Sequence, residues 1–233
     1  MAETASSYRI QLDGRWSLED LTILPHDYLQ VYAVVAHVLM LQDLPPVDFG
    51  DGDSPLFDPF LTRTERWGML YPWAGGYSAV NFYRALVRNL TPNSRPTIIA
   101  IQYASPGYID LLLWASAAHV VRRIIVNISK SLRELHSFYT DIYKGMQDRK
   151  LMQVDVRKRE LELSREELGF VLYAIKQLED VSGLTAEEAR ALKKLAPAIE
   201  NGAAELGALK VFMSLIRRVR TLAEHEHGGK IEF

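Results

Sequence analysis

The sequence predicts a mainly α-helical protein with a minor two-stranded β element, and with a long helical hairpin or coiled-coil-like helices in its C-terminal half. Two patterns carry this prediction: a short run rich in β-branched residues at 97–103, and apolar residues at heptad spacing from Val121 to Met146. The 233 residues, 48% of them hydrophobic, can bury a sizeable core. We expect an α+β part over 1–107 and a long-helix part over 108–233, or one continuous domain.

Two segments are predicted strands. Residues 97–103 form a bounded run, Thr-Ile-Ile-Ala-Ile-Gln-Tyr, which predicts a mostly buried strand. Residues 8–12 alternate apolar and polar side chains, as a strand with one face on a core does. We expect the two strands to pair with each other under a cover of helices, because two strands alone are marginal in water. The Ser-Pro-Gly sequence at 105–107 predicts the start of a helix, with Asp110 in its first turn.

Helices fill the rest of the N-terminal part. Residues 17–24 predict a short helix, because Pro25 disfavours helical geometry in the residue before it. Residues 25–41 carry apolar side chains over a wide arc, which is typical of a central, mostly buried helix. His37 lies on this helix and is interpreted as a core histidine rather than a ligand or a catalytic base. Further helices are predicted over 58–70 and 78–90.

Charge is distributed unevenly along the chain. Residues 1–58 carry two basic and ten acidic residues, whereas the remainder carries 25 basic and 19 acidic residues. The opposite signs suggest that the two parts face each other, within one chain or between subunits. Residues 42–57 form an acidic loop that fails the EF-hand template, because the position after Asp51 and Asp53 falls on Pro55 and no glutamate closes the loop. We interpret it as a loop without a metal.

The longest pattern in the sequence is a heptad repeat. Its apolar positions are separated alternately by four and three residues, the spacing of a coiled-coil seam. They are Val121, Ile125, Ile128, Leu132, Leu135, Tyr139, Ile142 and Met146. This pattern predicts an oligomer seam that pairs with a second chain. A core helix within one domain has the same spacing and stays an alternative.

The helical segment continues past the seam. Residues 108–179 as a single rod would be about 110 Å long. We favour an antiparallel hairpin that bends between residues 145 and 163. A last helix is expected over 203–226, ending near His225 and His227, whose spacing alone does not predict a metal site because their side chains diverge at a helix end.

Two weaker binding sites are alternatives to assembly. The turn at 71–77 precedes a helix and could present backbone N–H groups to an anion. The residues of this anion site are Arg66, Gly75, Gly76 and Arg84. The turn matches neither the P-loop nor the dinucleotide fingerprint, so a tight interhelical turn is the competing interpretation.

A basic segment is the second alternative. Its cationic side chains could neutralise phosphates of a nucleic acid. They are Arg122, Arg123, Lys130, Lys158 and Arg159. Acidic residues are interleaved with them at helical spacing, which is more often typical of paired charges on a solvated helix face.

The motifs of familiar enzymes do not occur in the sequence. There is no cysteine, no G-x-S-x-G and no H-E-x-x-H, so no catalytic residue, metal or cofactor is predicted. The N-terminus does not resemble a secretory signal, and no apolar run reaches the length of a membrane span. We therefore expect a cytoplasmic, non-enzymatic interaction or assembly protein that oligomerises through residues 108–180, as a homo-oligomer or with a protein partner. A catalytic site stays open.

Overall fold

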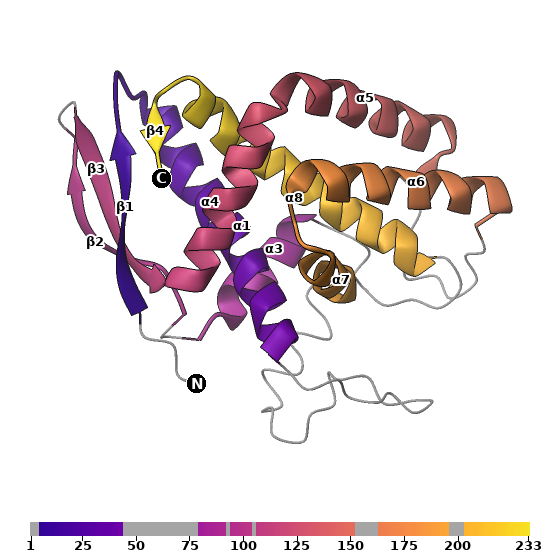
Figure 1. The fold of residues 1–233 in the computed structure, drawn as a ribbon, viewed down its shortest axis with the longest axis horizontal. Helices are drawn as coiled ribbons and strands as arrows, with labels where there is room; N and C mark the ends of the chain where they lie inside the picture. Colours follow the sequence, from indigo (N-terminus) through magenta and orange to yellow (C-terminus); the bar gives the residue numbers. More distant parts are fainter. Residues whose placement is uncertain (1–4, 44–78, 92–93, 104–105, 152–162, 196–202) are drawn as a thin grey trace.

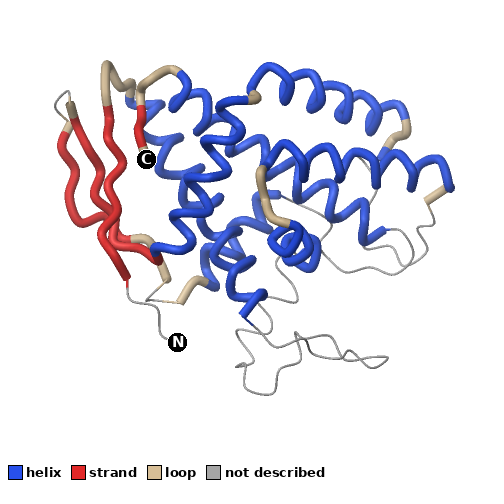
Figure 2. Tube along the Cα trace, in the orientation of Figure 1, coloured by secondary structure: helices blue, strands red, loops and turns tan. Residues whose placement is uncertain are grey.

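The fold was examined in a computed structural model. The structure describes residues 5–43, 79–91, 94–103, 106–151, 163–195 and 203–233. The described part is mainly helical, with a small antiparallel sheet on one side of the helices (Figures 1 and 2). None of the described helices is both long and apolar enough to cross a membrane.

Within the described residues the sheet has four strands rather than the predicted two. They are β1 (Ala5–Leu12), β2 (Thr97–Gln102), β3 (Gly107–Trp114) and β4 (Ile231–Glu232). The strand order is β2-β3-β1-β4, and every neighbouring pair is antiparallel. The expected pairing of residues 8–12 with residues 97–103 is therefore wrong, because both segments pair with β3, which lies between them.

The segment after residue 105 begins with a strand and not with the predicted helix. Along β3 the side chains of Ile109, Leu111 and Leu113 are buried, whereas those between them lie on the opposite face, which is the period of a strand. Asp110 belongs to this opposite face, where Nε of Arg9 donates to its Oδ1 at 2.6 Å across the β1–β3 pair. A strand partner, not a helix dipole, thus stabilises the Asp110 carboxylate.

The helices number seven within the described residues. They are α1 (Leu18–Asp43), α3 (Ala79–Asn89), α4 (Ala115–Lys130), α5 (Leu132–Asp148), α6 (Arg165–Ser182), α7 (Ala186–Leu195) and α8 (Ala203–His227). In Figure 1, α4 and α1 stand next to the sheet, and α5, α6 and α8 extend away from it. The predicted helix over 58–70 lies outside the described residues.

Helix α1 runs through the core without stopping at Pro25, so the two predicted helices are one. Ser17 caps it as predicted: the Asp20 N–H donates to Ser17 Oγ at 3.0 Å, and the Ser17 N–H donates to the Asp20 carboxylate at 3.1 Å. His37 is buried on α1, and its Nδ1 lies 2.7 Å from the backbone oxygen of Ala33. Burial lowers the pKa of His37, so the neutral ring of a core histidine is favoured.

Residues 108–179 do not form a single rod. Helix α4 ends at Lys130, where the Ser131 N–H donates to the backbone oxygen of Ile128 at 3.0 Å, and α5 ends at Asp148. Helix α6 begins with a capping box between Ser164 and Glu167. Helix α8 packs against α4, α6 and α1, so the long helices are joined in one core and a coiled coil is not seen.

A buried tyrosine fixes the position of the sheet relative to α1. The Tyr32 hydroxyl donates to the backbone oxygen of Ser94 at 2.9 Å and accepts from the Trp114 N–H at 3.0 Å. The first contact lies just before β2 and the second at the end of β3. One hydroxyl therefore holds the start of β2 and the end of β3, which lie together at the open end of this hairpin, against the core.

Candidate functional site

The predicted oligomer seam lies inside the fold. Six of its eight side chains are buried, and Leu132 and Tyr139 are partly buried against the same core. The buried members are Val121, Ile125 and Ile128 on α4, and Leu135, Ile142 and Met146 on α5. Helices α6 and α8 of the same chain pack against α4 and α5. The structure therefore corresponds to the alternative, a core helix, and a second chain could reach these side chains only by opening the fold.

The predicted anion site is mostly outside the described residues. Arg66, Gly75 and Gly76 belong to that part of the chain, and Arg84 lies exposed on α3. The structure gives no geometry for a phosphate-binding turn here, so the site stays a prediction.

The basic residues predicted to contact a nucleic acid also lie partly outside the described residues. Lys158 and Arg159 lie outside the described residues, and Arg122 and Lys130 are exposed on α4. Arg123, in contrast, forms an ion pair with the buried carboxylate of Glu188.

The ion pair of Arg123 has a structural role. Glu188 also accepts a hydrogen bond from the Thr185 N–H at 2.8 Å, which caps the start of α7. Arg123 therefore anchors α7 to α4, and one of the predicted phosphate contacts is already occupied by a carboxylate. Nucleic-acid binding through the remaining residues stays a prediction.

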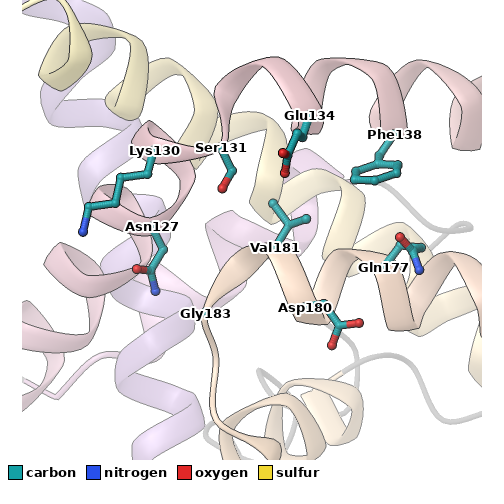
Figure 3. Close-up of a pocket in the computed structure, with 9 residues that line it drawn as sticks. All are labelled: Asn127, Lys130, Ser131, Glu134, Phe138, Gln177, Asp180, Val181 and Gly183. Atoms are coloured by element: carbon teal, nitrogen blue, oxygen red, sulfur yellow. The ribbon is translucent and has the colours of Figure 1, made fainter.

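A polar groove lies where α4 bends into α5 and faces the end of α6 (Figure 3). It encloses about 510 Å³ and is open to solvent. The residues that line it are Asn127, Lys130, Ser131, Glu134, Phe138, Gln177, Asp180, Val181 and Gly183. Figure 3 shows the Lys130 amino group and the Asp180 carboxylate pointing away from each other. Asp180 is paired instead with Lys176 at 2.8 Å. The groove therefore does not bring Lys130 and Asp180 together.

A charged cluster joins the two ends of the chain. The Asp20 carboxylate lies 3.2 Å from Nζ of Lys230 and 3.3 Å from Nε2 of His225, and the His225 ring stacks on Trp16 with 5.7 Å between the centroids. The Ser17 backbone N–H, Lys230 and His225 hold the pKa of Asp20 well below its ordinary value. These contacts hold the residues just before β4 against the start of α1, and sequence reasoning did not identify them.

The described residues do not form a metal site. Across these parts of the chain, no group of three or more His, Asp or Glu side chains is placed to hold a metal ion. The Nδ1 atom of His225 lies 2.8 Å from the backbone oxygen of Thr221, so both of its ring nitrogens face oxygen atoms.

Several large apolar side chains are exposed at the outer edge of the sheet. Strand β2, predicted to be buried, is exposed along its length. Ile98, Ile99 and Ile101 are 51%, 57% and 39% exposed, and Tyr103 directly after the strand is 69% exposed. Leu112 on the neighbouring strand β3 is exposed as well. Sequence reasoning identified these residues as apolar but placed them in the core.

Comparisons of the chain with protein-family models, with curated proteins and with solved structures gave no match.

Proposed function

We propose that this chain is a non-enzymatic interaction or assembly protein that forms homo-oligomers. The observation that supports the proposal is the group of exposed apolar side chains on β2 and directly after it, four large residues within six positions. Large apolar side chains exposed close together are typical of protein interaction sites, because covering them removes hydrocarbon from contact with water.

Because of this observation we expect the interface at β2 and not at the heptad residues. Those side chains are already covered by α6 and α8, whereas the isoleucines of β2 are not covered by the described helices. The long helices α4, α5 and α6 then act as the scaffold that supports the sheet through α4, which packs against β1 and β3.

Static light scattering coupled to size-exclusion chromatography tests the proposal. We expect a mass of at least two chains, each of 26.5 kDa, that persists when the salt concentration is raised, because apolar association is not screened by ions. A protein that remains monomeric from nanomolar to high micromolar concentration would contradict the proposal.

A further inference from the structure

Strand β2 is the long free edge of the sheet. In the order β2-β3-β1-β4 the two edges are β2, with six residues, and β4, with two residues. Within the described residues, β2 pairs only with β3, so its other side presents unpaired backbone N–H and C=O groups. Such groups can pair with a strand of another chain.

On the core-facing side of the sheet, the apolar side chains continue onto β2, where the described helices do not cover them. Ile101 lies opposite Ile109, and Ile98 lies opposite Leu111, so these two isoleucines share a face with buried residues of β3. The β3 residues are no more than 6% exposed, whereas Ile98 and Ile101 are 51% and 39% exposed. The apolar layer of the sheet thus extends beyond the helices that cover its centre.

Apart from one bulge, β2 lacks the features that usually keep monomers apart. The sequence Thr-Ile-Ile-Ala-Ile-Gln contains no charged residue and no proline, and its single irregularity is a bulge between Ile98 and Ala100. Monomeric sheet proteins commonly protect long edges with lysine, proline or short strands. Only the two-residue edge strand β4 is protected by its length.

We propose that β2 pairs antiparallel with β2 of a second copy of this chain, across a two-fold axis perpendicular to the sheet. This inference rests on the proposed function and names its interface. An antiparallel pair of identical strands matches donors with acceptors on both sides, and an uncharged strand brings no like charges together. This axis places the helices of both copies on the same side of the joined sheet. On that side, Ile98 and Ile101 of one copy pack against the same residues of the other.

The strand lengths also determine how the assembly ends. A head-to-tail arrangement would pair β2 of one copy with β4 of the next, but β4 offers only two residues. The symmetric β2–β2 contact uses the long edge of both copies and leaves no long edge free. It therefore produces a closed dimer and not a fibre.

The first experiment changes the charge of the edge. Ile98→Lys places a lysine on the strand, and Leu172→Lys, at a side chain of α6 that is 50% exposed, is the matched control. We expect light scattering to give a dimer for the wild type and for Leu172→Lys, and half that mass for Ile98→Lys. Circular dichroism and thermal melting check that the variants are folded.

The second experiment locates the contact without destabilising it. The chain has no cysteine, so a single cysteine introduced in turn at each position from 97 to 103 is the only thiol. A disulfide needs Cα atoms about 4.4–6.8 Å apart, which identical strands in antiparallel pairing reach only near the axis. Oxidative crosslinking should therefore peak at one position of β2 and fall on both sides, whereas Leu172→Cys should give no crosslinked dimer.

The outcomes separate the two proposals. An oligomer whose mass is unchanged by Ile98→Lys, and whose β2 cysteines do not crosslink, would overturn the strand pairing and leave the assembly function standing. A wild-type protein that is monomeric throughout would overturn the assembly function, and the pairing with it. Crosslinking spread evenly along β2 would exclude a two-fold antiparallel contact.

Discussion

The turn after α6 gives the sharpest prediction about stability. Gly183 ends this helix with φ +69°, a conformation that favours glycine. A Cβ atom at Gly183 would lie 1.9 Å from Nδ2 of Asn127 and 2.8 Å from its Cγ. Gly183→Ala therefore combines an unfavourable backbone with a collision against α4.

The two effects can be given magnitudes. A left-handed backbone costs a residue with a side chain about 1–2 kcal/mol. Turning the Asn127 side chain aside into the groove that both residues line costs about 0.5–1.5 kcal/mol. We expect Gly183→Ala to lower the free energy of unfolding by about 1.5–3.5 kcal/mol, a sizeable part of the stability of an ordinary domain.

Gly14 provides the matched control. It has φ +73°, but a Cβ there meets no atom within 4 Å, so Gly14→Ala should cost only the backbone contribution, about 1–2 kcal/mol. Urea unfolding followed by circular dichroism measures both variants. Adding Asn127→Ala should restore part of the stability of Gly183→Ala, and a double-mutant cycle isolates that part. If Gly183→Ala costs no more than Gly14→Ala, or if the cycle shows no coupling, the packing argument is wrong.

Three further measurements test other parts of the structure. Leu135→Ala, at a fully buried heptad position, should cost about 2–5 kcal/mol in urea unfolding and leave the oligomeric mass unchanged, since this side chain packs inside one chain. Arg123→Ala should cost about 1–3 kcal/mol because it leaves the buried Glu188 carboxylate without its cation, and Arg123→Lys should recover part of this loss. Because the partners of Asp20 bind its carboxylate form, its pKa is lower in the folded than in the unfolded protein, so their stabilisation is present at neutral pH and is lost as the pH falls below about 4. The stability difference between the wild type and Asp20→Asn should accordingly shrink in acid, and a difference that grows there would reverse the sign of this argument.

Local signals predicted the helical part of the fold well. The capping boxes at Ser164 and Thr185 and the glycine at 183 occur at helix ends in the structure, because each is a hydrogen-bonding or backbone preference that depends on a few neighbouring residues. Pro25 misled the prediction. It lies in the first part of a helix whose later part, Val31 to Val38, is buried, so that tertiary packing outweighs a local preference.

Strand β3 was missed because no local signal separates it from the helix that follows. It is rich in leucine, and α4 begins directly after Trp114 without a side-chain cap. The Trp114 N–H donates instead to Tyr32, which is 82 residues away in the sequence. A boundary fixed by such a distant contact cannot be recognised from neighbouring residues.

The heptad pattern shows a different limit of sequence reasoning. Val121 and Leu135 have the spacing of a seam, and both are buried, but the spacing does not say whether the covering helix belongs to the same chain. In this protein α8 covers them, and α8 follows α7, far from the heptad segment in sequence. Burial was therefore predictable and the identity of the cover was not.

Strand β2 shows the same limit: its burial was predicted from composition, but its side chains are exposed in one chain. Its composition is that of a buried strand, yet in one chain Ile98, Ile99 and Ile101 are exposed at an edge. Composition reflects the environment in which a segment functions, and an uncharged, β-branched edge in water is prone to aggregation. Pairing with a second β2 removes this conflict, because the strand then lies at the centre of a joined sheet and its isoleucines face apolar neighbours. The exposure seen in one chain then describes this surface before assembly, and the burial expected from the sequence describes it after assembly.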